Sequence, residues 1–198
     1  MKPSHQEKEF DFAIDAVDLA RQLIGAQIFF DGVGGRIVET EAYDQSDPAS
    51  HSFRGTTVRS SIMFGPAGYL YVYRSYGLHW CMNIVSGLPG HGAAVLLRAI
   101  EPLEGLIKMR ERRGITVPDK LLCAGPGRLC QALGIDVAQN GMPMDHPRFL
   151  FRPSTQLSPV SAGPRIGITK ATEMPWRFVL TGSPFLSKPF KGLVIDQS

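Results

Sequence analysis

Short strand-like segments bounded by turn residues dominate this sequence, and they constrain its fold more than any other feature. Each is rich in β-branched or aromatic residues and is flanked by glycine, proline or small polar residues. These segments are residues 27–30, 35–43, 69–74, 79–85, 93–100, 149–152, 165–169 and 177–181. Apolar residues at helical spacing occur in 15–25, 102–113 and 128–133. The sequence therefore predicts a mixed α/β (α+β) fold in which a curved, mainly antiparallel sheet is flanked by helices.

The connections between these segments carry predictions of their own. A glycine-rich turn over 31–35 joins the first two strands, and a polar loop follows from about residue 44 to 61. Ser75-Tyr76-Gly77-Leu78 lies between two strands and predicts the tip of a protruding β-hairpin. Residues 138–164 hold several prolines and are expected to form a mobile loop.

Length and composition resemble those of an ordinary globular protein. With 198 residues, 43% apolar and 20% charged, the chain is expected to form a single domain over 1–198. Residues 1–10 are polar and predict a flexible N-terminus without a secretory signal, and no apolar run is long enough to cross a bilayer. The three cysteines form no CxxC pair, which indicates reduced thiols. The net charge of +3 is compatible with a polyanion partner but does not require one.

The strand 37–43 contains two glutamates. Because side chains alternate along a strand, Ile37, Glu39, Glu41 and Tyr43 are expected to share one face. Carboxylates buried there would need partners. The alternative is a solvated strand face on which both glutamates are merely exposed, and by sequence alone this alternative is somewhat favoured.

Four tyrosines and a tryptophan fall within residues 69–80. Cross-strand aromatic packing accounts for Tyr71, which alternates with Tyr69 and Tyr73. It does not account for Tyr76, because a large ring at a hairpin tip gains little from packing. A protruding ring there could wedge between base steps of DNA.

Arg98 interrupts the apolar segment 93–100. An arginine in such a strand needs a buried anion or a cleft, unless it extends from an edge strand into solvent. With acidic residues available on another strand, a cleft is the favoured interpretation.

Taken together, these features resemble the alkyladenine (3-methyladenine) DNA glycosylase family. The matching motifs run in order through nearly the whole chain. They lie at 36–43, 49–51, 63–64, 70–73, 76–77, 81–83, 95–105, 125–126, 129–133, 165–167 and 182–184. The resemblance implies a base-excision-repair enzyme that flips a damaged purine out of duplex DNA and hydrolyses its N-glycosidic bond. The expected substrates are purines of the 3-methyladenine, 7-methylguanine, hypoxanthine and ethenoadenine type.

The resemblance also implies catalytic roles for three residues. Glu41 matches the general base that activates the attacking water, while Arg98 and the backbone carbonyl of Ile166 match groups that hold this water. Cleavage develops positive charge on the sugar, which an ionised carboxylate stabilises, and a nearby arginine keeps Glu41 ionised. No lysine falls in the matched core, so a monofunctional enzyme without lyase activity is expected, with no metal and no cofactor.

Base and DNA contacts follow from the same resemblance. Tyr43, His51 and Tyr73 match the residues that enclose the flipped base, and Asn83 matches one that restricts its exocyclic groups. The expected intercalating residues are Tyr76 and Leu78, the latter in place of a methionine of vertebrate relatives. The expected phosphate-binding residues are Arg54, Arg59 and Arg74. The implied partner is damaged double-stranded DNA bound by a monomer, in the cytoplasm at the nucleoid if bacterial or in the nucleus if eukaryotic, with no membrane.

Two alternatives stay open at this stage. A non-catalytic damaged-base-binding protein of the same fold would need neither Glu41 nor Arg98. A hydrolase or transferase of small molecules would not need a ring at a protruding tip or arginines for phosphates.

Overall fold

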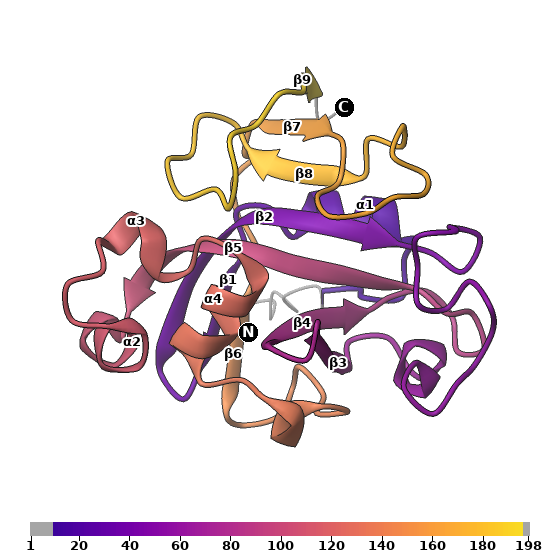
Figure 1. The fold of residues 1–198 in the computed structure, drawn as a ribbon, viewed down its shortest axis with the longest axis horizontal. Helices are drawn as coiled ribbons and strands as arrows, with labels where there is room; N and C mark the ends of the chain where they lie inside the picture. Colours follow the sequence, from indigo (N-terminus) through magenta and orange to yellow (C-terminus); the bar gives the residue numbers. More distant parts are fainter. Residues whose placement is uncertain (1–9, 196–198) are drawn as a thin grey trace, which may run out of the picture.

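The computed structural model describes residues 10–195, and its strands in this range join into one sheet (Figure 1). Every pairing between them is antiparallel, which confirms the predicted α+β class with a mainly antiparallel sheet. The strands are β1 Gln27–Phe30, β2 Val33–Tyr43, β3 Leu70–Ser75, β4 His79–Val85, β5 Ala94–Glu104, β6 Phe149–Arg152, β7 Val160–Gly163, β8 Arg177–Leu180 and β9 Leu193–Ile195. The main path runs β3-β4-β5-β2-β8-β7-β9, while β1 pairs with β2 and β6.

The helices of the described residues are short. They are α1 Ala16–Gln22, α2 Leu106–Arg113, α3 Asp119–Leu122 and α4 Pro126–Leu133, with 3-10 turns η1 Ser61–Phe64 and η2 Val137–Gln139. The Asp15 side chain accepts from the backbone N–H of Val17 and caps α1. Pro126 begins α4, where its missing N–H costs nothing. Within residues 10–195 none of these helices has the length and apolar character needed to cross a membrane.

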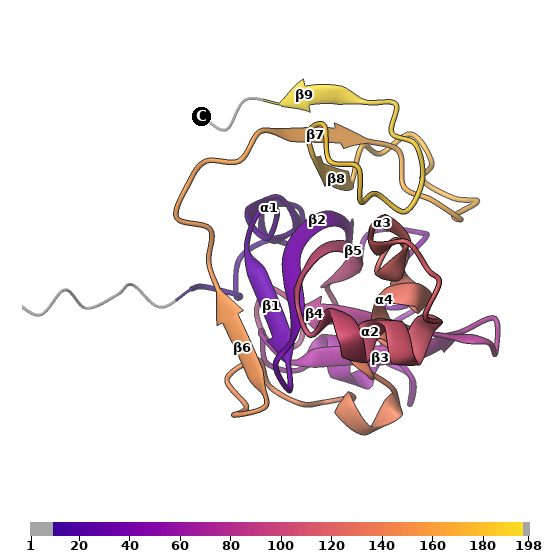
Figure 2. The ribbon, with the colours of Figure 1, turned by 90° about the vertical axis from the view of Figure 1, so that its left-hand side faces the viewer.

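The β3–β4 hairpin extends away from the body of the molecule, as predicted (Figure 2). At its tip Tyr76 and Gly77 both adopt positive φ, of 50° and 68°, and the N–H of Leu78 donates to the carbonyl of Ser75 at 3.0 Å. A non-glycine residue in this region costs about 1–3 kcal/mol. The tight turn therefore holds Tyr76 in a strained backbone conformation.

Three register shifts interrupt the pairing of the central strands β2 and β5, one between Gly34 and Gly35 and two beside Glu39. Ile37 pairs with Ile100 and Glu39 with Ala99, which leaves Val38 as the extra residue of β2. The next pair is Thr40 with Leu97, which leaves Arg98 as the extra residue of β5. Bulges bend a strand and re-aim side chains.

The bulge at Val38 gives the strand 37–43 a different facial pattern from the one expected. Ile37 packs in the main core, and Thr40 donates to the carbonyl of Ala20 on α1. Glu39 and Glu41 point elsewhere, toward arginines. Ile37 therefore does not share a face with the two glutamates, because the bulge at Val38 changes the alternation between them.

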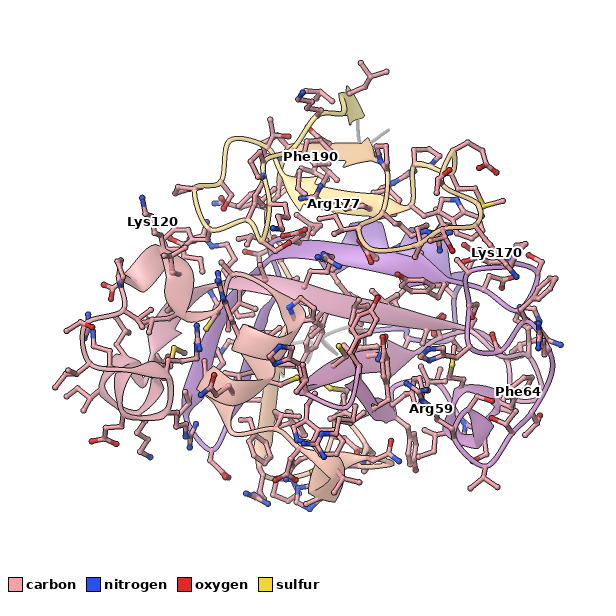
Figure 3. The ribbon with its side chains drawn as sticks, in the orientation of Figure 1. Arg59, Phe64, Lys120, Lys170, Arg177 and Phe190 are labelled. Carbon is pink, nitrogen blue, oxygen red and sulfur yellow. The ribbon has the colours of Figure 1, made fainter. Side chains whose placement is uncertain are left out.

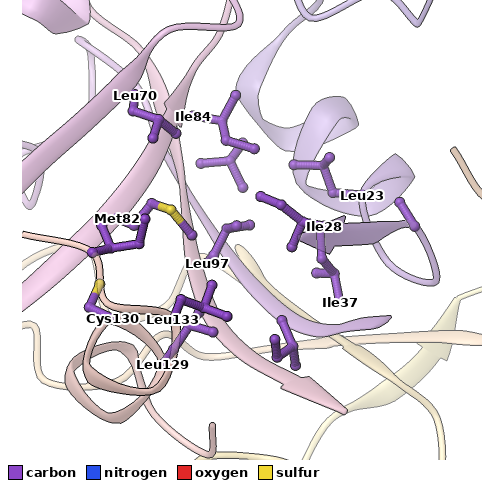
Figure 4. Close-up of a cluster of buried hydrophobic side chains, with 14 of the residues drawn as sticks. Leu23, Ile28, Ile37, Leu70, Met82, Ile84, Leu97, Leu129, Cys130 and Leu133 are labelled. Carbon is purple, nitrogen blue, oxygen red and sulfur yellow. The ribbon is translucent and has the colours of Figure 1, made fainter. Parts of the chain in front are cut away.

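The main hydrophobic core lies where α1 and α4 pack on the sheet (Figure 4). Its members come from distant parts of the chain, with Leu23 at the C-terminal end of α1, Met82 and Leu97 in the sheet, and Leu129 and Leu133 in α4. Burial of such side chains stabilises a fold by about 1.5–3 kcal/mol each. Cys81, Cys123 and Cys130 are free and buried.

Several expected boundaries differ from the structure. The predicted strand 165–169 is wrong, because these residues form a loop and the strand lies earlier, as β7. The helix expected from residue 102 begins at Leu106, since β5 continues to Glu104. The segment 138–164 contains β6 and β7 rather than one loop. The expectation of a flexible N-terminus over 1–10 lies, except for Phe10, outside the described residues.

The expected glycine-rich turn is shorter than the sequence indicates. Asp31 and Gly32 alone make it, with φ of 49° and 73°, as in a two-residue hairpin. Gly34 and Gly35 lie in β2, where a Cβ atom would be 2.0 Å and 1.9 Å from backbone oxygens of the neighbouring strands. These glycines therefore serve close strand approach and not the turn.

Candidate active site

A cleft of about 640 Å³ opens beside the β3–β4 hairpin. Residues from β2 to β5, from the loop 49–63, from the start of α4 and from the loop 166–168 line it. Three arginines, Arg59, Arg74 and Arg98, are among the lining residues, and no aspartate or glutamate is. The lining surface of the cleft is therefore cationic and suited to an anionic polymer.

Strand register assembles one wall of this site. Cross-strand pairs connect one residue from each of five adjacent strands, and directly paired residues lie on the same face of a sheet. This row comprises Tyr71, Asn83, Leu96, Glu41 and Arg177. The Asn83 side chain lines the cleft and donates to the carbonyl of Tyr71 at 2.9 Å. Residues that are up to 106 positions apart in sequence thus meet because the pairing is antiparallel and in register.

The Glu41 carboxylate lies beneath the cleft and is fully buried. Its Oε1 accepts from the backbone N–H of Ile166 at 2.7 Å and is 3.2 Å from Nη1 of Arg98. Its Oε2 accepts from the Tyr43 hydroxyl at 2.8 Å. The alternative of a solvated strand face is wrong, because both Glu39 and Glu41 have 0% exposure. The structure records the N–H of Ile166 at Glu41, and the role expected for the Ile166 carbonyl stays a prediction.

Glu39 is the centre of a second buried network. Its Oε1 accepts from Nε of Arg98 at 3.0 Å and from Nε of Arg177 at 2.8 Å. Its Oε2 accepts from the backbone N–H of Ser187 at 2.6 Å, and the Ser187 hydroxyl donates to Oε1 at 2.8 Å. Sequence reasoning assigned Glu39 no role. Its position two residues from Glu41 on the same strand was a signal that could have placed it at the site.

Arg98 connects the two networks. Burial alone would lower its pKa, but Glu41 and Glu39 outweigh burial and raise the pKa of Arg98 above its ordinary value. The guanidinium is therefore a permanent cation between two carboxylates. Arg98 is the extra residue of a bulge in β5, between the residues that pair with Glu39 and Thr40 of β2.

One wall of the cleft is aromatic. The His51 ring lies 4.6 Å from Tyr73 in an edge arrangement, and its Nδ1 is 3.0 Å from the Tyr71 hydroxyl. The Arg59 guanidinium lies 4.9 Å from the centre of the Tyr73 ring. Burial, and then the charge of Arg59, lower the pKa of His51, whereas burial raises the pKa of Tyr73. At neutral pH this wall therefore presents a neutral imidazole and a neutral phenol.

Tyr43 lines the cleft as well, with an arginine against its ring. Arg165 lies 4.7 Å from the centre of Tyr43 and 5.2 Å from that of Trp176, and it is fixed by a buried ion pair with Asp47. Burial, and then Glu41, raise the pKa of Tyr43. An arginine lies against the ring of both Tyr43 and Tyr73, so the attraction of these rings for a further cation is reduced. Sequence reasoning missed Arg165, although it stands in a matched motif.

The mouth of the cleft is exposed. Tyr76 and Leu78 have exposures of 88% and 72%, so the predicted protrusion of the hairpin tip is confirmed. Arg74 lines the cleft and lies 5.7 Å from the Trp80 ring. Of the expected phosphate-binding residues, Arg59 and Arg74 thus lie at the cleft, whereas Arg54 is exposed on the loop beyond its lining. Figure 3 shows Arg59 next to the hairpin strands.

Comparison with known proteins identifies the family. The family model described as methylpurine-DNA glycosylase matches residues 10–184. The chain belongs to the methylpurine-DNA glycosylase family. The protein is therefore a DNA glycosylase, an enzyme of DNA repair that hydrolyses N-glycosyl bonds, and the resemblance drawn from its motifs is confirmed.

Individual relatives agree with this family. A protein of Nitrosospira multiformis is 58% identical over 188 residues, which cover 95% of this chain and 97% of the relative. Relatives from Nitrobacter winogradskyi and Rhodopseudomonas palustris are 56% and 55% identical and cover 88% and 90% of this chain and 83% and 86% of their own length. All three are named, provisionally, as 3-methyladenine DNA glycosylases.

Proposed function

We propose that this single-domain glycosylase flips damaged purines out of duplex DNA and cleaves the N-glycosidic bond with a water activated by Glu41. The substrates are purines of the 3-methyladenine, 7-methylguanine, hypoxanthine and ethenoadenine type, and the DNA strand itself is not cut. The observation that carries this proposal is the Glu41 carboxylate held 3.2 Å from Arg98 directly beneath an aromatic-lined cleft. The names of the relatives support the 3-methyladenine class.

Glu41 acts at the sugar. As the bond to the purine breaks, the sugar gains positive charge, which a carboxylate stabilises while it accepts a proton from the attacking water. Arg98 lies against that carboxylate and, with the carbonyl of Ile166, holds the water. Because the Tyr43 hydroxyl occupies Oε2 in the free protein, water reaches Glu41 once Tyr43 rotates or shifts toward the flipped base.

The flipped base lies between Tyr43 and the pair His51 and Tyr73. Stacking on aromatic rings contributes on the order of 1–3 kcal/mol per base and tolerates many purines. Asn83, anchored by its bond to the Tyr71 carbonyl, limits the exocyclic groups that fit. The neutral state of His51 avoids a further cation beside a cationic base.

The hairpin tip fills the gap left in the duplex. Tyr76 and Leu78 insert between base steps, and Arg54, Arg59 and Arg74 bind phosphates of the backbone. The strained backbone of Tyr76 supports this role, because strain of this kind persists where the surrounding structure or the function requires it. The enzyme binds DNA as a monomer in the bacterial cytoplasm, at the nucleoid.

The test is excision from duplexes that carry one hypoxanthine or one alkylated adenine, followed by hot alkali to break abasic sites. The wild-type protein gives breaks after alkali and none before it. Glu41→Gln lowers the excision rate by about 100-fold or more while duplex binding stays, and Glu111→Gln, on the exposed face of α2, serves as the matched control. Strand breaks without alkali would contradict the monofunctional mechanism. Tight binding without breaks in the wild-type protein would indicate a non-catalytic damaged-base-binding protein.

A further inference from the structure

The floor of the cleft is defined here as the four buried charged residues Glu39, Glu41, Arg98 and Arg177. Their exposures are 0%, 0%, 6% and 4%. They comprise two carboxylates and two guanidiniums, so the cluster has no net charge. Buried charges that are paired and bonded in this way compensate one another, whereas removal of one leaves another uncompensated.

Only part of the floor reaches the cleft. Arg98 lines it, whereas the other three do not. Glu41 lies directly behind the lining, because it contacts the lining residues Tyr43, Ile166 and Arg98. Glu39 and Arg177 have no such set of contacts, so they act on a bound nucleotide only through Arg98 and Glu41. Glu39 instead binds Arg98 at 3.0 Å and Arg177 at 2.8 Å through the same oxygen. Arg98 uses its three nitrogens on three partners, with Nε on Glu39, Nη1 at Glu41 and Nη2 on the Ser187 hydroxyl at 3.2 Å.

The C-terminal segment closes this network. Arg177 donates through Nη2 to the carbonyl of Lys188 at 3.0 Å and lies 5.1 Å from the ring of Phe190. Figure 3 shows Arg177 and Phe190 near each other at the β7 and β8 end of the sheet, above β2. The backbone N–H of Ser187 donates to Glu39. The floor is therefore held from β2, β5, β8 and the segment after β8, and none of these contacts depends on substrate.

We propose that Glu39 and Arg177 are positioning residues, which hold the Arg98 guanidinium at Glu41 and balance the charge that Glu41 experiences. The inference rests on the proposed function of Glu41 as the base. The groups around Glu41 are Arg98 from β5, its cross-strand neighbour Arg177 from β8, the Tyr43 hydroxyl from β2, the N–H of Ile166 and, more distantly, the Cys81 thiol from β4. The two arginines are charged at neutral pH, and Glu39 binds both of them.

The proposal makes predictions of opposite sign. Glu39→Gln removes a negative charge next to Arg98, so the Glu41 carboxylate becomes harder to protonate. Arg177→Gln removes a positive charge and makes that carboxylate easier to protonate. The two charges removed have opposite signs, so the two shifts are expected in opposite directions. The double variant Glu39→Gln with Arg177→Gln restores neutrality and is expected to titrate close to the wild type.

The experiment measures the single-turnover excision rate of hypoxanthine against pH. The acidic limb is expected to move to lower pH in Glu39→Gln, to higher pH in Arg177→Gln and back in the double variant. Glu111→Gln is the matched control, because it removes a negative charge on the exposed face of α2, outside the floor, and leaves the acidic limb unmoved. Circular dichroism spectra establish that each variant is folded. If a single variant unfolds, the remaining folded single variant and the neutral double variant are compared with the wild type.

A second readout does not need activity. The titration of the Glu41 carboxyl carbon, labelled with ¹³C and identified by its loss in Glu41→Gln, is followed by NMR in the free protein. Shifts of opposite sign in the Glu41 titration support the proposal even if hypoxanthine is not excised. Absence of excision would contradict the proposed function and not the positioning of Arg98. An unmoved titration in both folded single variants, with activity lowered equally at every pH, would mean that Glu39 and Arg177 only stabilise the fold.

Discussion

The floor of the cleft is held by contacts between distant parts of the chain, whereas the mouth of the cleft is held by a local turn. The floor contains four charged side chains that are almost fully buried, each with at least one partner of opposite charge. The mouth, defined as Arg74, Tyr76 and Leu78, is exposed and is shaped by a turn of three residues. The comparison teaches that chemistry depends here on long-range contacts, whereas insertion into DNA depends on local backbone geometry.

The largest expected effect comes from emptying the centre of the floor. Arg98→Ala leaves Glu39 and Glu41 buried without the cation between them, and breaking a buried pair in this way costs about 3–5 kcal/mol. The free energy of unfolding, measured by urea denaturation, is expected to fall by that amount, with loss of excision. Arg74→Ala at the mouth is the matched arginine and is expected to change stability by less than about 0.5 kcal/mol. Equal losses in the two variants would remove the distinction between floor and mouth.

An intermediate effect is expected at the hairpin tip, where stability and activity should separate. Tyr76→Gly relieves the strain of the positive φ, of about 1–3 kcal/mol, but adds about 0.5–1 kcal/mol of chain entropy to the unfolded state. Thermal unfolding should therefore be unchanged or slightly higher in temperature. Excision should fall by roughly 10-fold to 100-fold, since the stacking worth about 1–3 kcal/mol is lost. Full excision by this variant would overturn the intercalating role of Tyr76.

The smallest effect concerns His51, between floor and mouth. Because its pKa in the folded protein lies below 6.5, the unfolded chain takes up a proton at a higher pH than the folded protein does. The stability contributed by the neutral ring is therefore present above pH 6.5 and is lost as the pH falls through the folded pKa. In Arg59→Gln one of the two causes is gone, so an NMR titration of the imidazole should give a pKa nearer to 6.5. An unchanged pKa of His51 in Arg59→Gln would assign the whole shift to burial. Arg112→Gln on α2 removes a distant arginine and serves as the control.

Local patterns predicted much of the fold and of the candidate site. Alternating strands, the helix within 15–25 and the turn at Gly77 are properties of a few neighbouring residues, and the structure has each of them near its expected place. The errors lie where neighbours across the sheet decide. Residues 165–169 have the composition of a strand, yet they form a loop whose Ile166 N–H binds Glu41. Gly34 and Gly35 have the composition of a turn, yet close strands require them in β2.

The sequence by itself determined which groups the site could use: two glutamates in one strand, one arginine in an apolar strand, and a tyrosine beside a glycine at a hairpin tip. Only the tertiary structure decided what they do to each other. Two bulges bring Arg98 between Glu39 and Glu41, and β8 with its following segment supplies Arg177 and Ser187 from 138 and 148 residues away. The reason is that burial and charge compensation depend on partners distant in the chain, which no local pattern specifies.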